Sequence, residues 1–344
     1  MNEALVKLDN HLAWDGRGQP FYELYPLQVN DTNGEWALWL SYGFTLPSLD
    51  HPGGLAVLTA NYLEKGAEKI CLRHEVDLIT NDVVHADQFI QIGDANLSLA
   101  DANGEITSPV KKSGTLTGKN TIKWELTFED PVMSSRLYPH RILYKSGYPA
   151  MKFLTPRLFG FVTGTVFVNH KKIKLFRDRV MQGHFYGSGQ PTDLASASCC
   201  HFREDTTAYF EGLSMDWPIG KFKKLVSFFT IHLEGEDYSA NSLLKALWQN
   251  KSEHDFDSWK ASFESKGFRF DVTIRRDPNL TIPLKNVTPQ ATVHFYESPL
   301  ADLDIKVFRR RRGIWQEDRL LTAKGMCSFL TASADKHPVV AFGQ

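Results

Sequence analysis

Two stretches that flank a turn decide the fold class, Phe21-Tyr-Glu-Leu-Tyr-Pro-Leu-Gln-Val29 and Trp36-Ala-Leu-Trp-Leu-Ser-Tyr-Gly-Phe44. In the second stretch, large apolar side chains occupy every second position, which is the period of a β-strand. The residues between the stretches, Asn30-Asp-Thr-Asn-Gly34, end in Asn-Gly, a dipeptide that tight hairpin turns prefer. This region therefore predicts an antiparallel β-hairpin.

The same alternation recurs along the chain, most clearly in residues 122–129 and 268–275. In both segments apolar residues at even positions alternate with polar or charged residues at odd positions, so each strand has a buried face and a solvated face. Turn signals rich in Gly, Pro and Asn separate the runs. The pattern predicts an all-β fold built from antiparallel sheets.

One exception to the β pattern lies between residues 239 and 263, where apolar residues follow helical spacing. They are Leu243, Leu244, Leu247, Trp248, Phe256, Trp259 and Phe263. We therefore expect one or two short helices near residues 240–265, with strands resuming after Gly267.

Length and charge limit the class of protein. With 344 residues the chain exceeds what one ordinary hydrophobic core serves, so we expect two domains. Lys and Arg number 39 and Asp and Glu number 40, a formal charge of -1 that gives no global attraction to nucleic acid. We expect small neutral partners and no nucleic acid, and the sequence leaves the oligomeric state open.

The apolar content gives no sign of a membrane protein. No apolar run reaches 18 residues, and the first ten residues lack the apolar core of a signal peptide. Four cysteines without a C-x-x-C pair are typical of a reducing compartment. We therefore expect a cytoplasmic protein without stable membrane insertion.

A polar row lies in Met181-Gln-Gly-His-Phe-Tyr-Gly187, between strand-like segments at residues 158–179 and 194–202. If this stretch is extended, Gln182, His184 and Tyr186 share one face and offer hydrogen-bonding groups side by side. Inside a barrel they would form a binding site, with Gln182 as a ligand-binding residue and the other two as catalytic residues. A satisfied structural network is the other interpretation, and the sequence does not decide between them.

The segment Ser198-Cys-Cys-His201 follows closely. A strand here places Cys199 and His201 on one face, where a Cys/His nucleophile pair or a metal site can be imagined. The small neutral neighbours favour buried structural thiols instead. We keep Cys199 and His201 as candidate ligand-binding residues and expect no metal.

Acidic and aromatic residues supply the remaining candidates. Glu23, Glu211 and Asp216 lie near aromatic segments, where a carboxyl group in an apolar cavity can transfer a proton, and Glu23 is our candidate catalytic acid. Trp39 and Trp217 are candidate ligand-binding residues, although aromatic side chains at alternate strand positions are also typical of a plain core. The motifs of P-loop, dinucleotide-binding, serine-hydrolase and zinc-protease sites are absent, so we expect no cofactor.

The basic run Arg309-Arg-Arg-Arg312 invites a nucleic-acid interpretation. It is followed by Gly313 and then by Glu317 and Asp318, so we interpret it as a charged hairpin tip whose repulsion the nearby acids relieve.

Five motifs together resemble one known family. They are Phe21-Tyr-Glu-Leu-Tyr25, Trp36-Ala-Leu-Trp-Leu-Ser-Tyr42, Phe153-Leu-Thr-Pro156, Gly164-Thr-Val166 and Met181-Gln-Gly-His-Phe-Tyr-Gly187. They are similar to motifs of the lipocalin-like superfamily that includes tocopherol cyclase, carotenoid 1,2-hydratase and fungal Diels–Alderases, over residues 20–335. The resemblance implies two consecutive lipocalin-like antiparallel β-barrels, which we place in residues 1–185 and 186–344. It also implies a hydrophobic pocket in a barrel or near their junction, and chemistry on terpenoid or polyketide-like substrates without a redox cofactor.

Three functions follow as hypotheses. The first is a protein that binds an apolar small molecule such as an isoprenoid, a lipid or a polyketide-like compound. If it is an enzyme, we expect a cofactor-independent cyclisation, hydration or isomerisation. The second is a non-catalytic carrier of hydrophobic ligands, and the third is a protein-interaction scaffold, which filled barrel interiors without a cavity would favour.

Overall fold

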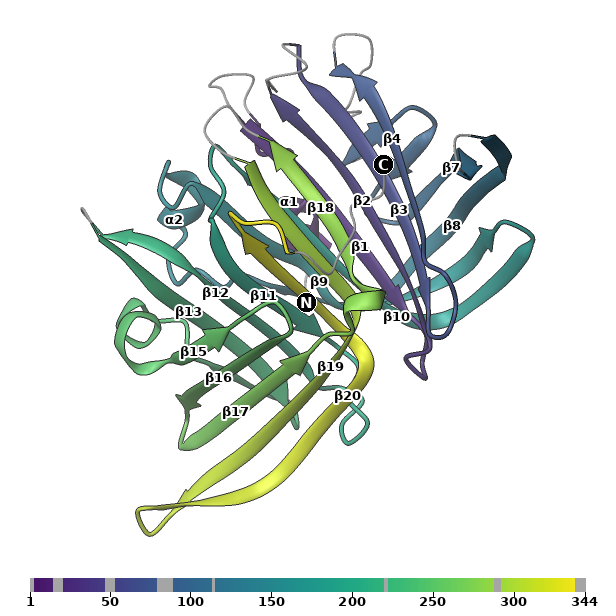
Figure 1. Ribbon diagram of the computed structural model, residues 1–344. Coiled ribbons are helices and arrows are strands. Elements are labelled where there is room, and N and C mark those ends of the chain that lie inside the picture. The colour runs from purple at the N-terminus through teal and green to yellow at the C-terminus, as the bar shows by residue number, and fades with distance from the viewer. Residues whose placement is uncertain are drawn as a thin grey trace. The chain divides into compact units, whose positions relative to one another are not determined.

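The computed structural model describes residues 3–14, 21–46, 53–78, 89–112, 115–219, 222–287 and 292–337. Most of the regular structure in them is antiparallel β-strand, which confirms the all-β prediction (Figure 1). The chain divides into two compact units. Unit 1 comprises Met1–Asp31, Trp36–Ser134 and Leu154–Gly189, and unit 2 comprises Thr32–Glu35, Ser135–Phe153 and Gln190–Gln344.

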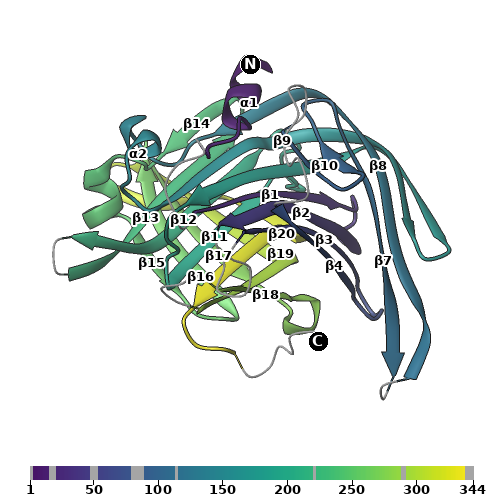
Figure 2. The same cartoon turned by 90° about the horizontal axis from the view of Figure 1, so that it is seen from above.

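Unit 1 is built around a ten-stranded antiparallel sheet with the order β4-β3-β2-β1-β10-β9-β8-β7-β6-β5. Its elements are α1 (Glu3–Asp9), β1 (Phe21–Asn30), β2 (Trp36–Leu46), β3 (Leu55–Glu64), β4 (Ile70–Asp77), β5 (Ile90–Ile92), β6 (Ala95–Leu97), β7 (Asp101–Lys112), β8 (Thr115–Ser135), β9 (Met151–Val168) and β10 (Lys171–Gly187). Figure 2 shows β7 and β8 side by side as a long curved pair.

The predicted hairpin is present as β1 and β2, with Asn30 opposite Ala37 and Gln28 opposite Trp39. Apolar residues on one face of these strands, such as Leu27 and Leu40, belong to the hydrophobic core of unit 1. The other neighbour of β1 is β10, which brings residues 22–30 against residues 179–187. The polar row of β10 is therefore set beside the first strand of the chain.

Unit 2 contains a second ten-stranded antiparallel sheet, with the order β14-β13-β12-β11-β20-β19-β17-β16-β15 and with β18 paired to β19. Its elements are α2 (Ile142–Lys145), β11 (Asp193–Cys199), β12 (Tyr209–Ile219), β13 (Phe222–Leu233), β14 (Glu236–Ser239), the π-helix η2 (Lys245–Gln249), β15 (Lys251–His254), β16 (Ser258–Ser265), β17 (Phe268–Arg275), the 3-10 helix η3 (Pro278–Leu280), β18 (Ile282–Val287), β19 (Thr292–Arg311) and β20 (Ile314–Ser333).

Aromatic rings fill the core of unit 2. Phe263 stacks on Phe229 and on Phe270 with ring centroids 4.9 Å apart in each case, and Trp259 is fully buried beside Phe229. Because stacked rings leave little free volume, the interior of this sheet is occupied by side chains.

The short helix expected near residues 240–265 is present as η2, but the second half of that stretch is the strand β16. Trp259, Ala261 and Phe263 are buried there and alternate with more exposed neighbours, which is period two. The helical interpretation was wrong for residues 258–263 because it counted only the large aromatic residues and overlooked Ala261 between them.

Two strand ends also differ from expectation. Residues 158–179 form two strands that turn at Asn169 and His170, where Asn169 has a φ of 53°. The strand expected through Phe202 stops at Cys199, so His201 does not share a strand face with Cys199. No helix in the described part of the chain is long and apolar enough to cross a membrane.

Candidate functional sites

The polar row of β10 lies on the face of the sheet that carries the core of unit 1. Glu23 pairs with Tyr186, and Leu27 with Gln182, across the β1–β10 ladder. Because paired residues point to the same side and side chains alternate along a strand, Gln182, His184 and Tyr186 share one face with Glu23 and Tyr25. The strand geometry confirms that the row exists.

His184 is hydrogen-bonded at both ring nitrogens. Its Nδ1 lies 2.6 Å from the backbone carbonyl oxygen of Asp9, and its Nε2 lies 2.8 Å from Oε1 of Glu23. A carbonyl oxygen and a carboxylate oxygen are hydrogen-bond acceptors, so both ring nitrogens of His184 face acceptors. The imidazole also stacks on Tyr25, with ring centroids 4.3 Å apart.

Glu23 completes this network. Its Oε1 accepts hydrogen bonds from the Tyr25 hydroxyl at 2.7 Å and from the Ala13 amide at 2.8 Å, and its Oε2 accepts one from the Trp14 amide at 3.1 Å. The side chains of His184 and Glu23 are 1% and 0% exposed. The pair therefore fixes the segment after α1 against β1 and β10, and no imidazole nitrogen is left for a ligand.

The remaining members of the row extend the same contacts. Gln182 donates from Nε2 to Oδ1 of Asn10 at 2.5 Å, and Asn10 donates to the Val6 carbonyl at 3.0 Å. The Tyr186 ring lies 5.0 Å from that of His184 and is only partly buried. The structure thus brings together four predicted site residues, Glu23, Gln182, His184 and Tyr186, and their catalytic and binding roles stay predictions.

The other predicted residues lie elsewhere. Trp39 is opposite Gln28 and Asn61, on the face of β2 that points away from the core. Cys199 is buried in the core of unit 2, where burial and the neighbouring Cys199 thiol raise the pKa of the Cys327 thiol well above its ordinary value. Trp217 packs edge-on against Tyr138 at 5.7 Å, and His201 follows the end of β11.

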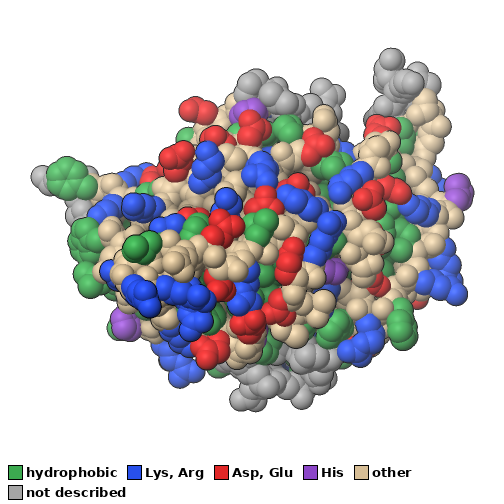
Figure 3. Space-filling view, turned by 90° about the horizontal axis from the view of Figure 1, so that it is seen from below, with side chains coloured by type: hydrophobic (Ala, Val, Ile, Leu, Met, Phe, Trp, Pro, Cys, Tyr) green, Lys and Arg blue, Asp and Glu red, His purple; other side chains and the backbone are tan. Residues whose placement is uncertain are grey.

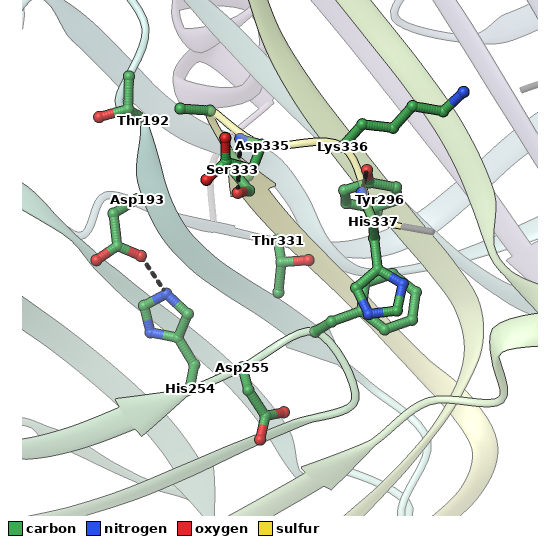
Figure 4. A pocket seen from close by; sticks show the side chains of 13 residues that line it. Thr192, Asp193, His254, Asp255, Tyr296, Thr331, Ser333, Asp335, Lys336 and His337 are labelled. Carbon is green, nitrogen blue, oxygen red and sulfur yellow. Dashed lines mark hydrogen bonds and ion pairs between the residues drawn. The ribbon is translucent and has the colours of Figure 1, made fainter. Parts of the chain in front are cut away.

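Unit 2 contains a pocket of about 450 Å³ that the sequence did not predict. It lies where the start of β11, the end of β15 and the strands β19 and β20 meet, because Asp193 pairs with Ser333 and Tyr296 with Thr331. Its lining residues are Thr192, Asp193, His254, Asp255, Phe256, Tyr296, Thr331, Ala332, Ser333, Ala334, Asp335, Lys336 and His337 (Figure 4).

An Asp–His pair stands on one side of this pocket, across from Tyr296 and His337 (Figure 4). Nε2 of His254 lies 2.7 Å from Oδ1 of Asp193, and the side chains are 8% and 55% exposed. The hydrogen bond from His254 holds the pKa of the Asp193 carboxyl below its ordinary value. Nδ1 of His254 is buried without a hydrogen-bond partner among the described residues.

Aromatic rings form another wall of the pocket, and a buried cation packs against them. The His337 ring stacks on Phe256 with centroids 3.6 Å apart. The Arg276 guanidinium lies between Phe256 and Phe329, at 4.8 and 4.3 Å from the ring centroids. It donates to the Tyr296 carbonyl at 3.1 Å and to the Thr331 hydroxyl at 2.9 Å, so it fixes β19 and β20 at the pocket.

Behind this wall lies a buried carboxyl group. Glu297 follows Tyr296 on β19, so its side chain points to the opposite face. Burial raises the pKa of Glu297 to about 7, and it accepts a hydrogen bond from the Ser328 hydroxyl at 2.8 Å. Burial likewise lowers the pKa of Arg276 to about 10, which leaves that group cationic at neutral pH.

Sequence reasoning missed the pocket because its residues come from four separate segments. His254 lies within residues 240–265, where we expected one or two short helices, and Asp193 lies directly before the strand-like segment at residues 194–202. Once residues 258–265 are a strand, the preceding Lys251–His254 becomes its hairpin partner. A search for period two in residues 251–265 was the one signal that would have placed His254 on a strand.

The described residues form two compact units, each built on a ten-stranded antiparallel sheet. No protein-family model matches the chain, and no curated protein matches it. Among the described residues, no group of three His, Cys, Asp or Glu side chains is placed to hold a metal ion.

Solved structures give the fold by similarity. Kievitone hydratase from Nectria haematococca is 9% identical, with a TM-score of 0.55 over 97% of this chain and 93% of its own. CghA, solved with Sch210972, is 10% identical, with a TM-score of 0.54 over 92% and 90%. An AttH candidate from Nitrosomonas europaea is 9% identical, with a TM-score of 0.52 over 94% and 97%. At these identities the likeness confirms the lipocalin-like fold that the motifs indicated.

Proposed function

We propose that the chain binds a small molecule with an apolar body in the unit 2 pocket and stabilises positive charge that develops on it. The observation that carries the proposal is the Asp193–His254 pair on the wall of a pocket whose opposite wall is aromatic. The reaction class that fits is a cofactor-independent cyclisation, hydration or isomerisation of an isoprenoid, lipid or polyketide-like compound.

The aromatic wall of the pocket fits the apolar body of the proposed ligand. Phe256, Tyr296 and His337 present rings to the pocket, and stacking on Arg276 and on one another fixes their orientation. Ring faces carry partial negative charge, so they attract a cationic centre as well as apolar surface. A pocket of about 450 Å³ is within the range of small-molecule sites.

The carboxyl groups that line the pocket fit the proposed stabilisation of positive charge on the ligand. Asp193, Asp255 and Asp335 line the pocket against one ammonium group, that of Lys336. Because its pKa is lowered, Asp193 is anionic at neutral pH, and it acts as a fixed counter-charge rather than as a strong base. His254 is a positioning residue that holds one carboxylate oxygen, while the exposed remainder of Asp193 faces the ligand.

The kievitone hydratase likeness supports this reaction class only by analogy of fold, since identity is 9%. A non-catalytic carrier remains the second candidate, and the filled aromatic core of unit 2 favours it, because the bound molecule would be held at one end of the sheet rather than folded within a large cavity.

The test uses benzyltrimethylammonium as a cationic aromatic probe and phenylmethanesulfonate as its anionic counterpart, with binding measured by calorimetry. We expect the cation to bind and the anion not to bind. Asp193→Asn should weaken the cation by about tenfold, the size of one close charge pair. Glu253→Gln is the matched control, because Glu253 is exposed on β15 next to His254 and lies outside the pocket.

Two results decide between the functions. Equal binding of both probes would contradict charge stabilisation and favour the carrier function. An equal loss of cation binding in the Asp193→Asn and Glu253→Gln variants would do the same. Native mass spectrometry of protein from its own host then identifies the bound compound, and turnover of that compound that Asp193→Asn abolishes would establish the enzyme.

A further inference from the structure

The longest hairpin of unit 2 ends in a tip with unusual chemistry. β19 and β20 pair through Arg311 and Ile314 and turn at Arg312 and Gly313, whose φ angles are 50° and 84°. In Figure 1 this hairpin extends beyond the other strands of its sheet. This confirms the hairpin tip predicted for the basic run.

The four guanidinium groups of the tip, Arg309 to Arg312, make no ion pair with a carboxylate in the part of the chain that the structure describes. Glu317 and Asp318, which we expected to relieve their repulsion, form their ion pairs with other residues. Glu317 lies 4.0 Å from Lys306, and Asp318 pairs with Arg319 at 3.0 Å. The tip therefore carries four positive charges without an ion-pair partner among the described residues, in a chain whose formal net charge is -1.

Aromatic rings under the tip are already covered by cations. Arg309 lies 5.5 Å from the Phe268 ring, and Arg310 lies 5.8 Å from the Trp315 ring. Arg269 lies 4.2 Å from the Phe308 ring. Contact with these aromatic rings helps to hold the arginine side chains in place.

Ile314 is the apolar residue at the turn, and its side chain is 67% exposed. It stands opposite Arg311 and directly after Gly313. Figure 3 shows the face that carries the tip, with Lys and Arg side chains gathered at its left. An exposed apolar side chain next to a run of arginines combines two features of a membrane-docking surface.

We infer that this tip docks on a lipid surface with anionic headgroups. The arginines contact headgroup phosphates and carboxylates, while Ile314 enters the boundary between headgroups and acyl chains. The chain stays peripheral, because one isoleucine and a hairpin tip are far short of a spanning segment. The inference goes beyond the pocket and does not depend on what the pocket binds.

Two observations favour a membrane over a nucleic acid. Recognition of single strands relies on exposed aromatic faces for base stacking, and Phe308 and Trp315 are covered by Arg269 and Arg310. An exposed isoleucine adds nothing to phosphate contacts, but it adds apolar burial on a membrane.

The test is flotation of the full chain with vesicles of phosphatidylcholine, with and without phosphatidylserine. We expect binding only to the anionic vesicles, and loss of that binding as salt is raised, because screening shortens charge interactions. Neutralising the four arginines to Gln should weaken binding by at least about a hundredfold, since each basic residue near an anionic surface contributes about fivefold.

Ile314→Ser tests the apolar contribution separately. It should weaken binding by about tenfold and leave the salt dependence unchanged, since it removes apolar burial without removing charge. The matched control replaces four exposed lysines away from the tip, Lys119, Lys145, Lys174 and Lys260, by Gln, which gives the same net charge. The control should bind like the unaltered chain.

Three outcomes would overturn the inference. They are absence of binding to anionic vesicles, an equal loss in the lysine control, and tighter binding to polyuridylate than to vesicles with no effect of Ile314→Ser on either. The Asp193→Asn variant of the pocket should float normally, so failure of membrane docking and failure of the proposed pocket function are distinguishable.

Discussion

Two histidine–carboxylate pairs with nearly the same geometry occupy different settings in this chain. His184 and Glu23 in unit 1 are 2.8 Å apart, and His254 and Asp193 in unit 2 are 2.7 Å apart. In the first pair the other imidazole nitrogen is bound to the Asp9 carbonyl, whereas in the second it has no partner among the described residues. The difference teaches that the surroundings of such a pair, and not the pair itself, separate a structural clamp from a binding group.

The largest expected effect comes from breaking the enclosed pair. His184→Ala removes a hydrogen-bond partner of the buried Glu23 side chain and leaves a cavity beside it, so we expect the free energy of unfolding to fall by about 3–5 kcal/mol. Urea unfolding followed by circular dichroism measures it. His11→Ala, at an exposed position next to the same segment, should change stability by less than about 0.5 kcal/mol. A decrease in the free energy of unfolding of less than about 1 kcal/mol for His184→Ala would contradict a structural role for the His184–Glu23 pair.

The buried carboxyl groups of Glu23 and Glu297 differ in the hydrogen bonds that they accept. Glu23 accepts from four donors, whereas Glu297 accepts a single side-chain hydrogen bond and has its pKa raised to about 7 by burial. Between about pH 4.5 and 7 the folded state keeps the Glu297 proton that the unfolded state loses, so stability falls as pH rises, by up to about 3 kcal/mol.

Glu297→Gln should remove that decrease, because the amide does not titrate. The measurement is urea unfolding at a series of pH values, with the slope of stability against pH as the readout. Glu264→Gln, at an exposed site on β16, should keep the decrease. An unchanged slope in Glu297→Gln would show that this carboxyl is ionised in the folded protein at neutral pH.

A smaller effect on stability is expected at the contact between Gln182 and the segment before β1. Asn10→Ala removes the acceptor for Nε2 of Gln182 and leaves that buried amide unsatisfied, at a cost of about 1–3 kcal/mol. Thermal and urea unfolding measure it, and Gln249→Ala at an exposed position serves as the control. Equal stability of the two variants would mean that the segment before β1 adds nothing to unit 1.

The smallest effect on stability should follow from breaking the Asp193–His254 pair of the pocket. His254→Gln should cost less than about 1 kcal/mol, because Asp193 is 55% exposed and solvent screens the interaction. The pKa of Asp193, lowered by His254, should return toward its ordinary value. Loss of benzyltrimethylammonium binding as pH falls should therefore begin at a higher pH than in the unaltered chain. The same pH in both would show that His254 does not hold the Asp193 charge.

Local patterns predicted much of the fold and part of the sites. Period two placed β1, β2 and β17 correctly, and the alternation through Gln182, His184 and Tyr186 put them on one face. The partners of that row were not predictable in the same way. Asp9, Asn10 and Glu23 lie far from it in the sequence. The β1–β10 pairing brings Glu23 into contact with the row, and Asp9 and Asn10 reach it from the end of α1.

The unit 2 pocket was not predicted for the same reason. In addition, part of the sequence near it was assigned a helical period instead of the period of a strand. Asp193, His254, Tyr296 and His337 carry no shared spacing, and they meet because β11, β19 and β20 are neighbours. Interpreting residues 256–263 as helical hid the β15–β16 hairpin that positions His254. A local sequence pattern predicts the face of the strand on which a side chain lies. The pairing of strands determines which other side chains it contacts.

The pairing of β1 with β10 also affects how the chain is made. During synthesis β1 acquires β2 at once, but its other edge waits until Gly187 has emerged, on the order of ten seconds or more at usual elongation rates. β11 likewise waits for β20. Its sequence from Ala195 to Ser198 consists of small residues with low strand propensity and little apolar surface, which suits an edge that stays open, whereas Phe21 to Val29 is rich in aromatic and aliphatic side chains. The nascent first hairpin is therefore where a holding chaperone, or aggregation in its absence, should act on this chain.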